Sequence, residues 1–220
     1  MYLRHAHISR RLRRAVALGL FVPALLTSCG NGTEPQAAPA ETAAPDGVRR
    51  IELPRPLPQP DLTLTGVSGR PVNLAEATKG KVALVFFGYT NCPDVCPTTM
   101  ADVAAALRKM PPGERSRIAV VFVSSDPWRD TPKAIKSWLA AFDRSFIGMT
   151  GDFTKIQAAA RTLGIGLERP EVREGDYEVT HGGQLVVFGT DRRASVIYPS
   201  GVSSRELAAD LPRLLRGGAS

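Results

Sequence analysis

The stretch of sequence that decides the fold is Lys81-Val82-Ala83-Leu84-Val85-Phe86-Phe87-Gly88-Tyr89-Thr90-Asn91-Cys92-Pro93-Asp94-Val95-Cys96-Pro97. Residues 81–88 are almost continuously apolar, which is typical of a strand buried on both faces of a sheet. Residues 98–110 carry apolar side chains at the spacing of one helix face, among them Met100, Val103 and Leu107. A pair of cysteines therefore lies between a buried strand and the helix that follows it.

The rest of the chain alternates strands with helices. Further strands are predicted at residues 62–65, 72–74, 118–123, 185–188 and 195–198, and helices at 131–142, 153–163 and 203–215. Asp152 is expected to cap the helix at 153–163 and Gly164 to end it. This order predicts an α/β fold, a central sheet covered by helices, over residues 61–216. The cysteine pair directly after a buried strand makes the predicted sheet thioredoxin-like.

The spacing of Cys92 and Cys96 leaves several chemistries open. Positions i and i+4 of a helical turn share a face, with Cβ atoms about 5–6 Å apart, which suits two sulfurs on one metal. Modest adjustment would give the Cβ separation of a disulfide, about 3.8 Å. The adjacent helix N-terminus favours the thiolate, which both binds metal and attacks disulfides. The spacing fits a structural disulfide, a metal site or a redox-active Cys92–Cys96 disulfide.

The N-terminus has the pattern of an export leader. Arginine-rich residues 4–14 precede the apolar stretch 15–26, which is shorter than the roughly 20 residues needed to span a bilayer but suits a signal-peptide core. It ends in Leu26-Thr27-Ser28-Cys29, which resembles the lipobox of bacterial lipoproteins. We predict a signal peptide at residues 1–28, lipidation of Cys29, and a cell-membrane lipoprotein whose domain lies on the extracytoplasmic face. The alternative is an ordinary signal peptide with an incidental Cys29.

Most of the positive charge belongs to this leader. The formal net charge is +7, and residues 1–28 hold five of the 28 basic residues and none of the 21 acidic ones. The rest of the chain is nearly neutral, so its charge does not predict a nucleic-acid partner. Residues 29–60 are rich in alanine and proline and lack a hydrophobic period, which predicts a disordered, extended tether. A partly ordered arm over residues 48–60 is the alternative.

Few strong metal ligands remain beyond the leader and its lipidation site. They are Cys92, Cys96 and a single histidine, His181. Two thiolates are soft ligands that favour Cu(I), whereas a closed zinc site needs four protein ligands. A lone histidine is more often a surface or capping residue than a ligand. In a thioredoxin-like sheet, however, the loop that carries His181 into the next buried strand would face the cysteines, so both interpretations of His181 stand.

Three segments resemble the SCO/SenC family of cytochrome c oxidase assembly proteins. They are residues 86–97, which include Cys-Pro-Asp-Val-Cys-Pro, residues 125–132, which read Ser-Asp-Pro-Trp-Arg-Asp-Thr-Pro, and the late Tyr177-x-Val-Thr-His181. The resemblance spans residues 60 to 213. It implies a thioredoxin-like fold and copper bound by Cys92, Cys96 and His181.

The resemblance also implies a function. Family members are implicated in delivering copper to the dinuclear copper centre of oxidase subunit II, so we expect a copper metallochaperone for Cu(I), with Cu(II) conceivable. Expected partners are subunit II, other copper chaperones and a thiol reductant. The alternative is a membrane-anchored thiol-disulfide oxidoreductase acting on the cysteines of that subunit, with Cys92 attacking and Cys96 resolving. Enzymatic activity is therefore left open.

One position departs from the family pattern. Family members commonly have aspartate directly before the ligand histidine, and this chain has Thr180. The change removes a negative charge and a hydrogen-bond partner for the imidazole, which predicts weaker binding or an altered Cu(II) preference. The loop at residues 126–132 is expected near the cysteines, either as a partner contact or as the entry to the following helix.

Overall fold

A computed structural model of the chain describes residues 47–169, 171 and 177–217. These residues form an eight-stranded sheet in the order β1-β8-β7-β4-β5-β6-β2-β3. The strands are β1 (Ile51–Pro58), β2 (Thr63–Gly66), β3 (Pro71–Asn73), β4 (Val82–Gly88), β5 (Ile118–Ser124), β6 (Ile147–Thr150), β7 (Leu185–Phe188) and β8 (Arg193–Tyr198). The helices are α1 (Leu74–Ala77), α2 (Val95–Lys109), α3 (Pro112–Arg115), α4 (Pro132–Leu139), α5 (Phe153–Thr162) and α6 (Ser204–Leu215).

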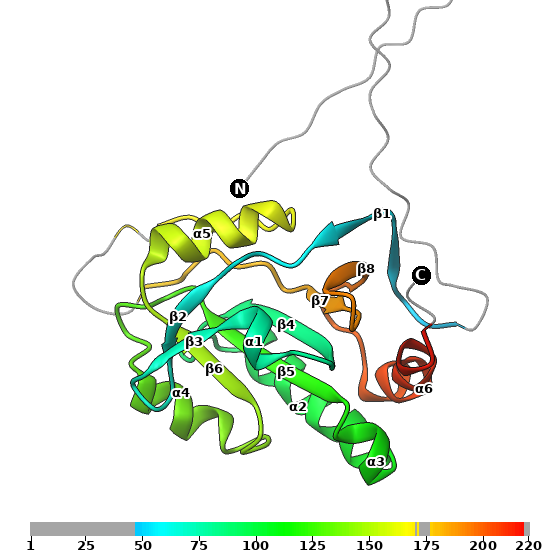
Figure 1. Ribbon diagram of the computed structural model, residues 1–220. Coiled ribbons are helices and arrows are strands. Elements are labelled where there is room, and N and C mark those ends of the chain that lie inside the picture. The colour runs from blue at the N-terminus through cyan, green and yellow to red at the C-terminus, as the bar shows by residue number, and fades with distance from the viewer. Residues whose placement is uncertain (1–46, 170, 172–176, 218–220) are drawn as a thin grey trace, which may run out of the picture. The chain divides into compact units, whose positions relative to one another are not determined.

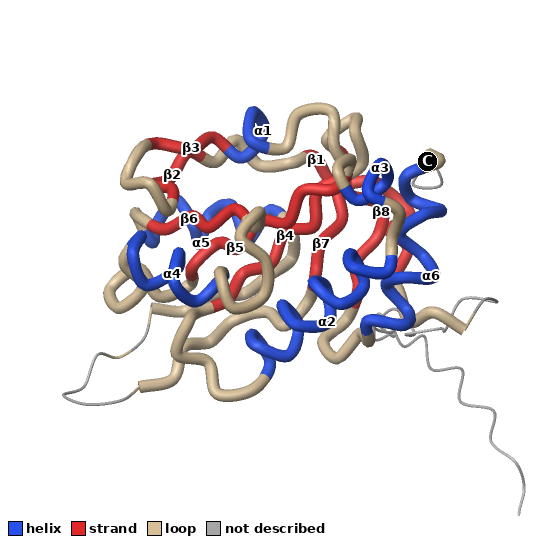
Figure 2. Tube along the Cα trace, turned by 90° about the horizontal axis from the view of Figure 1, so that it is seen from below, coloured by secondary structure: helices blue, strands red, loops and turns tan. Residues whose placement is uncertain are grey.

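The centre of the sheet is parallel and both flanks are antiparallel, since β2 pairs antiparallel with β6 and with β3 on the other side. Strands β4, β5 and β6 pair in parallel, while β7 runs antiparallel to β4, and β8 antiparallel to β7. Figure 2 follows the strands across the sheet from β2 and β3 to β8. Every residue of β4 and β5 is buried, as their continuous apolar sequences predict.

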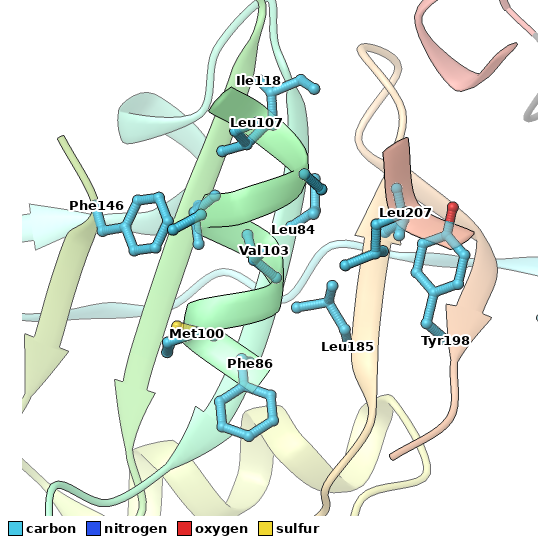
Figure 3. Close-up of a cluster of buried hydrophobic side chains, with 14 of the residues drawn as sticks. Leu84, Phe86, Met100, Val103, Leu107, Ile118, Phe146, Leu185, Tyr198 and Leu207 are labelled. Carbon is cyan, nitrogen blue, oxygen red and sulfur yellow. The ribbon is translucent and has the colours of Figure 1, made fainter. Parts of the chain in front are cut away.

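Helices cover both faces of this sheet and create two hydrophobic cores. Figure 1 shows α5 on one side of the strands and α2, α4 and α6 on the other. Because successive side chains of a strand point to opposite faces, Leu84 and Phe86 belong to the core under α2, and Val85 and Phe87 to the core under α5. Figure 3 shows the first of these cores, where α2 places Met100, Val103 and Leu107 beside β4. Each fully buried side chain of this size contributes about 1.5–3 kcal/mol.

The predicted helix ends are confirmed where side chains cap them. The Asp152 carboxylate accepts hydrogen bonds from the backbone N–H groups of Thr154 and Lys155 at the start of α5. Gly164 follows the end of that helix with φ of +73°, a conformation in which glycine is not strained. At the start of α6, Ser203 and Glu206 form a capping box.

The prediction of a disordered tether is wrong for part of residues 29–60. Residues 51–58 form β1, an edge strand that pairs with β8. Three prolines, at positions 54, 56 and 58, suggested a tether because they cannot donate ladder hydrogen bonds. An edge strand tolerates them, since one of its two sides needs no donors. Sequence patterns also missed the short elements α1, α3 and β6.

The predictions for the leader lie outside the described residues. They concern the signal peptide at residues 1–28, lipidation of Cys29 and the first part of the tether. Among the helices that the structure does describe, none has the length and apolar character needed to cross a membrane.

Candidate metal centre

Both motif cysteines lie at the junction between the end of β4 and the start of α2. The strand ends at Gly88, and Asp94 is the N-cap residue of the helix, which begins at Val95, three residues before the predicted start. Cys96 therefore occupies the first helical turn and is 0% exposed, whereas Cys92 precedes the helix and is 8% exposed. The backbone N–H of Cys96 donates a hydrogen bond to the Cys92 sulfur at 3.4 Å. Both residues are free thiols.

The sheet topology brings His181 to this pair. Because β7 runs antiparallel to β4, its first residue, Leu185, pairs with Phe86 near the end of β4. The loop that leads into β7 therefore lies beside the cysteines. The Nε2 atom of His181 is 3.3 Å from the Cys92 sulfur. One ligand atom from each of Cys92, Cys96 and His181 lies within 4.8 Å of the other two, so the three side chains could hold one metal ion.

The two thiols have opposite acidities. Burial acts to raise the pKa of Cys92, but hydrogen bonds from the Cys96 backbone, the His181 ring and the Asp94 backbone outweigh it and lower this pKa to about 7. Burial raises the pKa of Cys96 well above its usual value, and the neighbouring Cys92 adds to this effect. Near neutral pH Cys96 keeps its proton and Cys92 is partly ionised, and a metal bound by both sulfurs would displace the protons that remain.

The loop at residues 126–132 contributes to the site and also starts a helix. The Asp130 carboxylate is buried and accepts hydrogen bonds from the backbone and hydroxyl of Thr90 and from the Ser124 hydroxyl. These bonds fix the turn that leads to Cys92. Thr131 caps α4 by accepting from the backbone N–H of Ala134. The loop therefore lies near the cysteines as predicted, and it is the helix entry as well.

An aromatic ring packs against the imidazole. The side chain of Thr180 is exposed, whereas the rings of Tyr89 and His181 lie 5.2 Å apart between centroids. Sequence reasoning gave no role to Tyr89, Arg129 or Tyr177, although each lies in a segment that carries the family resemblance. Their proximity to the cysteines is a property of the fold, and no local pattern signals it.

Gly88 is required by the close approach of Cys96. A Cβ atom at this position would lie 2.7 Å from the Cys96 sulfur and 2.6 Å from a ring carbon of Phe86, both buried. We expect Gly88→Ala to lower the free energy of unfolding by about 1–3 kcal/mol and to displace the sulfur. Urea denaturation measures the first effect and copper titration the second. Gly113→Ala is the control, because an added Cβ meets nothing within 4 Å there, and equal effects of both changes would contradict the packing argument.

The fold and site together define a class, a thioredoxin-like domain with a cysteine–cysteine–histidine cluster suited to a soft metal ion. The model of the SCO1/SenC family matches residues 54–216, and the chain belongs to this family. The predicted family and fold class are thereby confirmed.

Proteins from bacteria and plants show the same relationship. A candidate copper-binding protein of Stutzerimonas stutzeri is 35% identical over 159 residues, which are 72% of this chain and 78% of that protein. The mitochondrial protein SCO1 homolog 1 of Arabidopsis thaliana is 34% identical over 102 residues, which are 46% of this chain and 30% of the longer relative.

Solved structures extend the likeness to three dimensions. Apo Sco1 of Thermus thermophilus is 37% identical with a TM-score of 0.66, and the match covers 74% of this chain and 94% of that one. Copper-bound ScoI of Bradyrhizobium japonicum is 32% identical with a TM-score of 0.61, and the match covers 73% and 98% of the two chains.

Proposed function

We propose that this protein is a copper-binding metallochaperone that acts in the assembly of cytochrome c oxidase. The observation that carries the proposal is the convergence of Cys92, Cys96 and His181 within 4.8 Å. The copper-bound relative from Bradyrhizobium japonicum supports the metal, and the description of the Sco family as cytochrome c oxidase assembly proteins supports the process.

The donor set suits copper better than zinc. Thiolates select Cu(I), and three ligands, two sulfurs and one nitrogen, satisfy it. A closed zinc site needs a fourth protein ligand, and the cluster formed by the described residues contains three. Cu(II) would require a further weak ligand at the exposed side of the cluster.

Differences in burial predict how copper would leave. Cys96 is fully buried at the base of the cluster, while His181 is only half-buried. A partner thiolate or imidazole would therefore displace His181 first and Cys96 last. Ligand-by-ligand exchange of this kind keeps copper coordinated throughout its transfer.

The place of action and the partner follow from the leader and the family. We infer an export signal at residues 1–28, a lipid anchor at Cys29, and a short tether that ends before β1. A SCO1/SenC lipoprotein from Bacillus anthracis, 25% identical with a TM-score of 0.62, supports anchoring to a membrane. The proposed recipient is the copper centre of oxidase subunit II, on the extracytoplasmic side, and a separate thiol reductant would keep Cys92 and Cys96 reduced.

The thiol acidities favour a second function. Cys92 is a thiol of pKa about 7 that keeps 8% of its surface exposed, whereas Cys96 is fully buried and its pKa is raised. An acidic attacking thiol beside a protected resolving thiol suits a thiol-disulfide oxidoreductase. This alternative predicts that copper-free protein reduces an oxidised subunit II peptide. His181→Ala, which removes one of the hydrogen bonds that lower the pKa of Cys92, should slow this reduction without abolishing it.

The first test is His181→Ala. We expect the affinity for Cu(I) to fall by about tenfold or more. Loss of a residue that hydrogen-bonds a metal ligand costs about 10–100-fold in affinity, and loss of the ligand itself should cost at least as much. The measurement is competition with a chromogenic Cu(I) chelator, using the full-length chain with Cys29→Ser so that Cys92 and Cys96 are its only thiols. Thr180→Ala, at the exposed neighbouring position, is the matched control. An unchanged affinity for both Cu(I) and Cu(II) in His181→Ala would refute this ligand set.

The second test is made in the native host. Deletion of the gene is expected to lower cytochrome c oxidase activity, and added copper is expected to restore it, because excess metal bypasses a delivery step. Oxidase activity in membranes is the measurement. If a thiol reductant restores activity and copper does not, the oxidoreductase alternative is favoured.

A further inference from the structure

We propose that Arg129 is a positioning residue that, with Asp126 and Tyr177, holds His181 in place to bind copper. This inference rests on the proposed copper site. It assigns a specific task to three side chains that are not themselves proposed copper ligands.

The support begins at a buried carboxylate. Asp126 is 0% exposed, and its two oxygens have different partners. One forms an ion pair with the Arg129 guanidinium, and the other accepts a hydrogen bond from the Tyr177 hydroxyl at 2.9 Å. Because an uncompensated buried charge is costly, this carboxylate fixes the orientation of both partners.

Arg129 then holds Tyr177 at two further points. Its guanidinium donates a hydrogen bond to the Tyr177 backbone carbonyl at 2.9 Å. The same group lies over the Tyr177 ring, with its central carbon 3.6 Å from the ring centroid, which is favourable for a cation–π contact. Tyr177 is therefore fixed by its hydroxyl, its ring and its carbonyl, four positions before His181 in the sequence.

A second route runs through Tyr89. The Arg129 guanidinium carbon is 5.7 Å from the Tyr89 ring centroid, and that ring is 5.2 Å from the imidazole of His181. Arg129 thus contacts both the segment that carries His181 and the ring that packs against it.

These contacts matter because the segment that carries His181 lies outside the helices and strands. Residues 177–184 are in neither a helix nor a strand, so no backbone ladder sets the position of His181. Ligand geometry must nevertheless be held within about 0.5 Å for tight binding. Side-chain contacts from the 126–129 loop supply that constraint.

The experiment is a double-mutant cycle on copper affinity, in the full-length chain with Cys29→Ser. We expect Arg129→Met to weaken Cu(I) binding by about tenfold, at the lower end of the range for outer partners of a ligand. In a His181→Ala background the same change should alter the affinity less than about twofold, because the residue that it positions is gone. Arg161→Met, an exposed arginine on α5, is the matched control.

A spectroscopic readout separates positioning from general stability. Arg129→Met should shift the thiolate-to-Cu(II) charge-transfer band in the same direction as His181→Ala does, whereas a merely destabilised site would lose amplitude without a shift. Tyr177→Phe removes a single hydroxyl, so it is expected to fold and to give a smaller change in the same direction. If Arg129→Met does not fold, the result with Tyr177→Phe decides whether the cluster positions His181.

The outcomes distinguish the two proposals. If His181→Ala leaves the affinity unchanged, the copper site itself is wrong. If His181→Ala weakens binding but Arg129→Met and Tyr177→Phe do not, the positioning role is wrong. An equal loss from Arg129→Met in both backgrounds would also overturn it, because Arg129 would then act independently of His181.

Discussion

Cys96→Ser is expected to abolish stoichiometric copper binding, reducing occupancy from about one Cu(I) per chain to a small fraction at equal concentrations. A serine hydroxyl is a hard ligand that Cu(I) does not favour, so one sulfur and one nitrogen would remain. The residue is fully buried in the first turn of α2, where water cannot replace the missing sulfur. Metal analysis after gel filtration measures occupancy, and circular dichroism checks that the fold persists.

Cys29→Ser is the matched control, since it removes the one thiol that lies outside the motif. It should leave occupancy unchanged. The same Cys96→Ser variant also tests the oxidoreductase alternative, which predicts that Cys92 would attack a disulfide target and remain trapped as a mixed disulfide. Full copper occupancy in Cys96→Ser would contradict the proposed ligand set, whereas trapping of a subunit II peptide on Cys92 would support the oxidoreductase.

The sequence predicts the central part of the fold well, for a clear physical reason. Strands β4 and β5 are buried on both faces, so all positions before their last residues, Gly88 and Ser124, are apolar and the pattern is strong. The cysteines follow β4 directly, and their place before a helix is a local property of the chain. Capping residues such as Asp152 and Ser203 are local signals as well, and both act as caps.

The remaining features depend on contacts between distant segments. Residues alone left His181 undecided, because its approach to Cys92 depends on β7 pairing with β4. The predicted position of its loop left a ligand role open, and the family resemblance favoured that role. Strand β1 was not predicted because its own sequence is rich in proline. It is stabilised by pairing with β8, about 140 residues later in the chain. The Asp126–Arg129–Tyr177 cluster joins two loops whose sequences carry no shared pattern.

Asp210→Ala is expected to have the largest effect on stability, lowering the free energy of unfolding by about 3–5 kcal/mol. This carboxylate on α6 is buried and accepts hydrogen bonds from Arg50 at 3.3 Å, Arg213 at 2.7 Å and the Tyr198 hydroxyl at 2.7 Å. Arg50 is itself buried just before β1, so removing the carboxylate leaves a buried positive charge and a buried hydroxyl without this acceptor. Urea denaturation of the copper-free chain measures the loss, with Arg205→Ala on the exposed face of α6 as the control.

The same variant tests whether the edge of the sheet and the copper site are independent. Asp210 joins α6 to β8 and to the segment before β1, whereas the proposed ligands come from the end of β4, the start of α2 and the loop before β7. Folded Asp210→Ala protein should therefore bind Cu(I) with unchanged affinity even though less of it is folded. A loss of affinity in the folded fraction would show that the β1–α6 contact supports the metal site. In that case, anchoring of the N-terminal segment and copper binding would be coupled through β8 and β7.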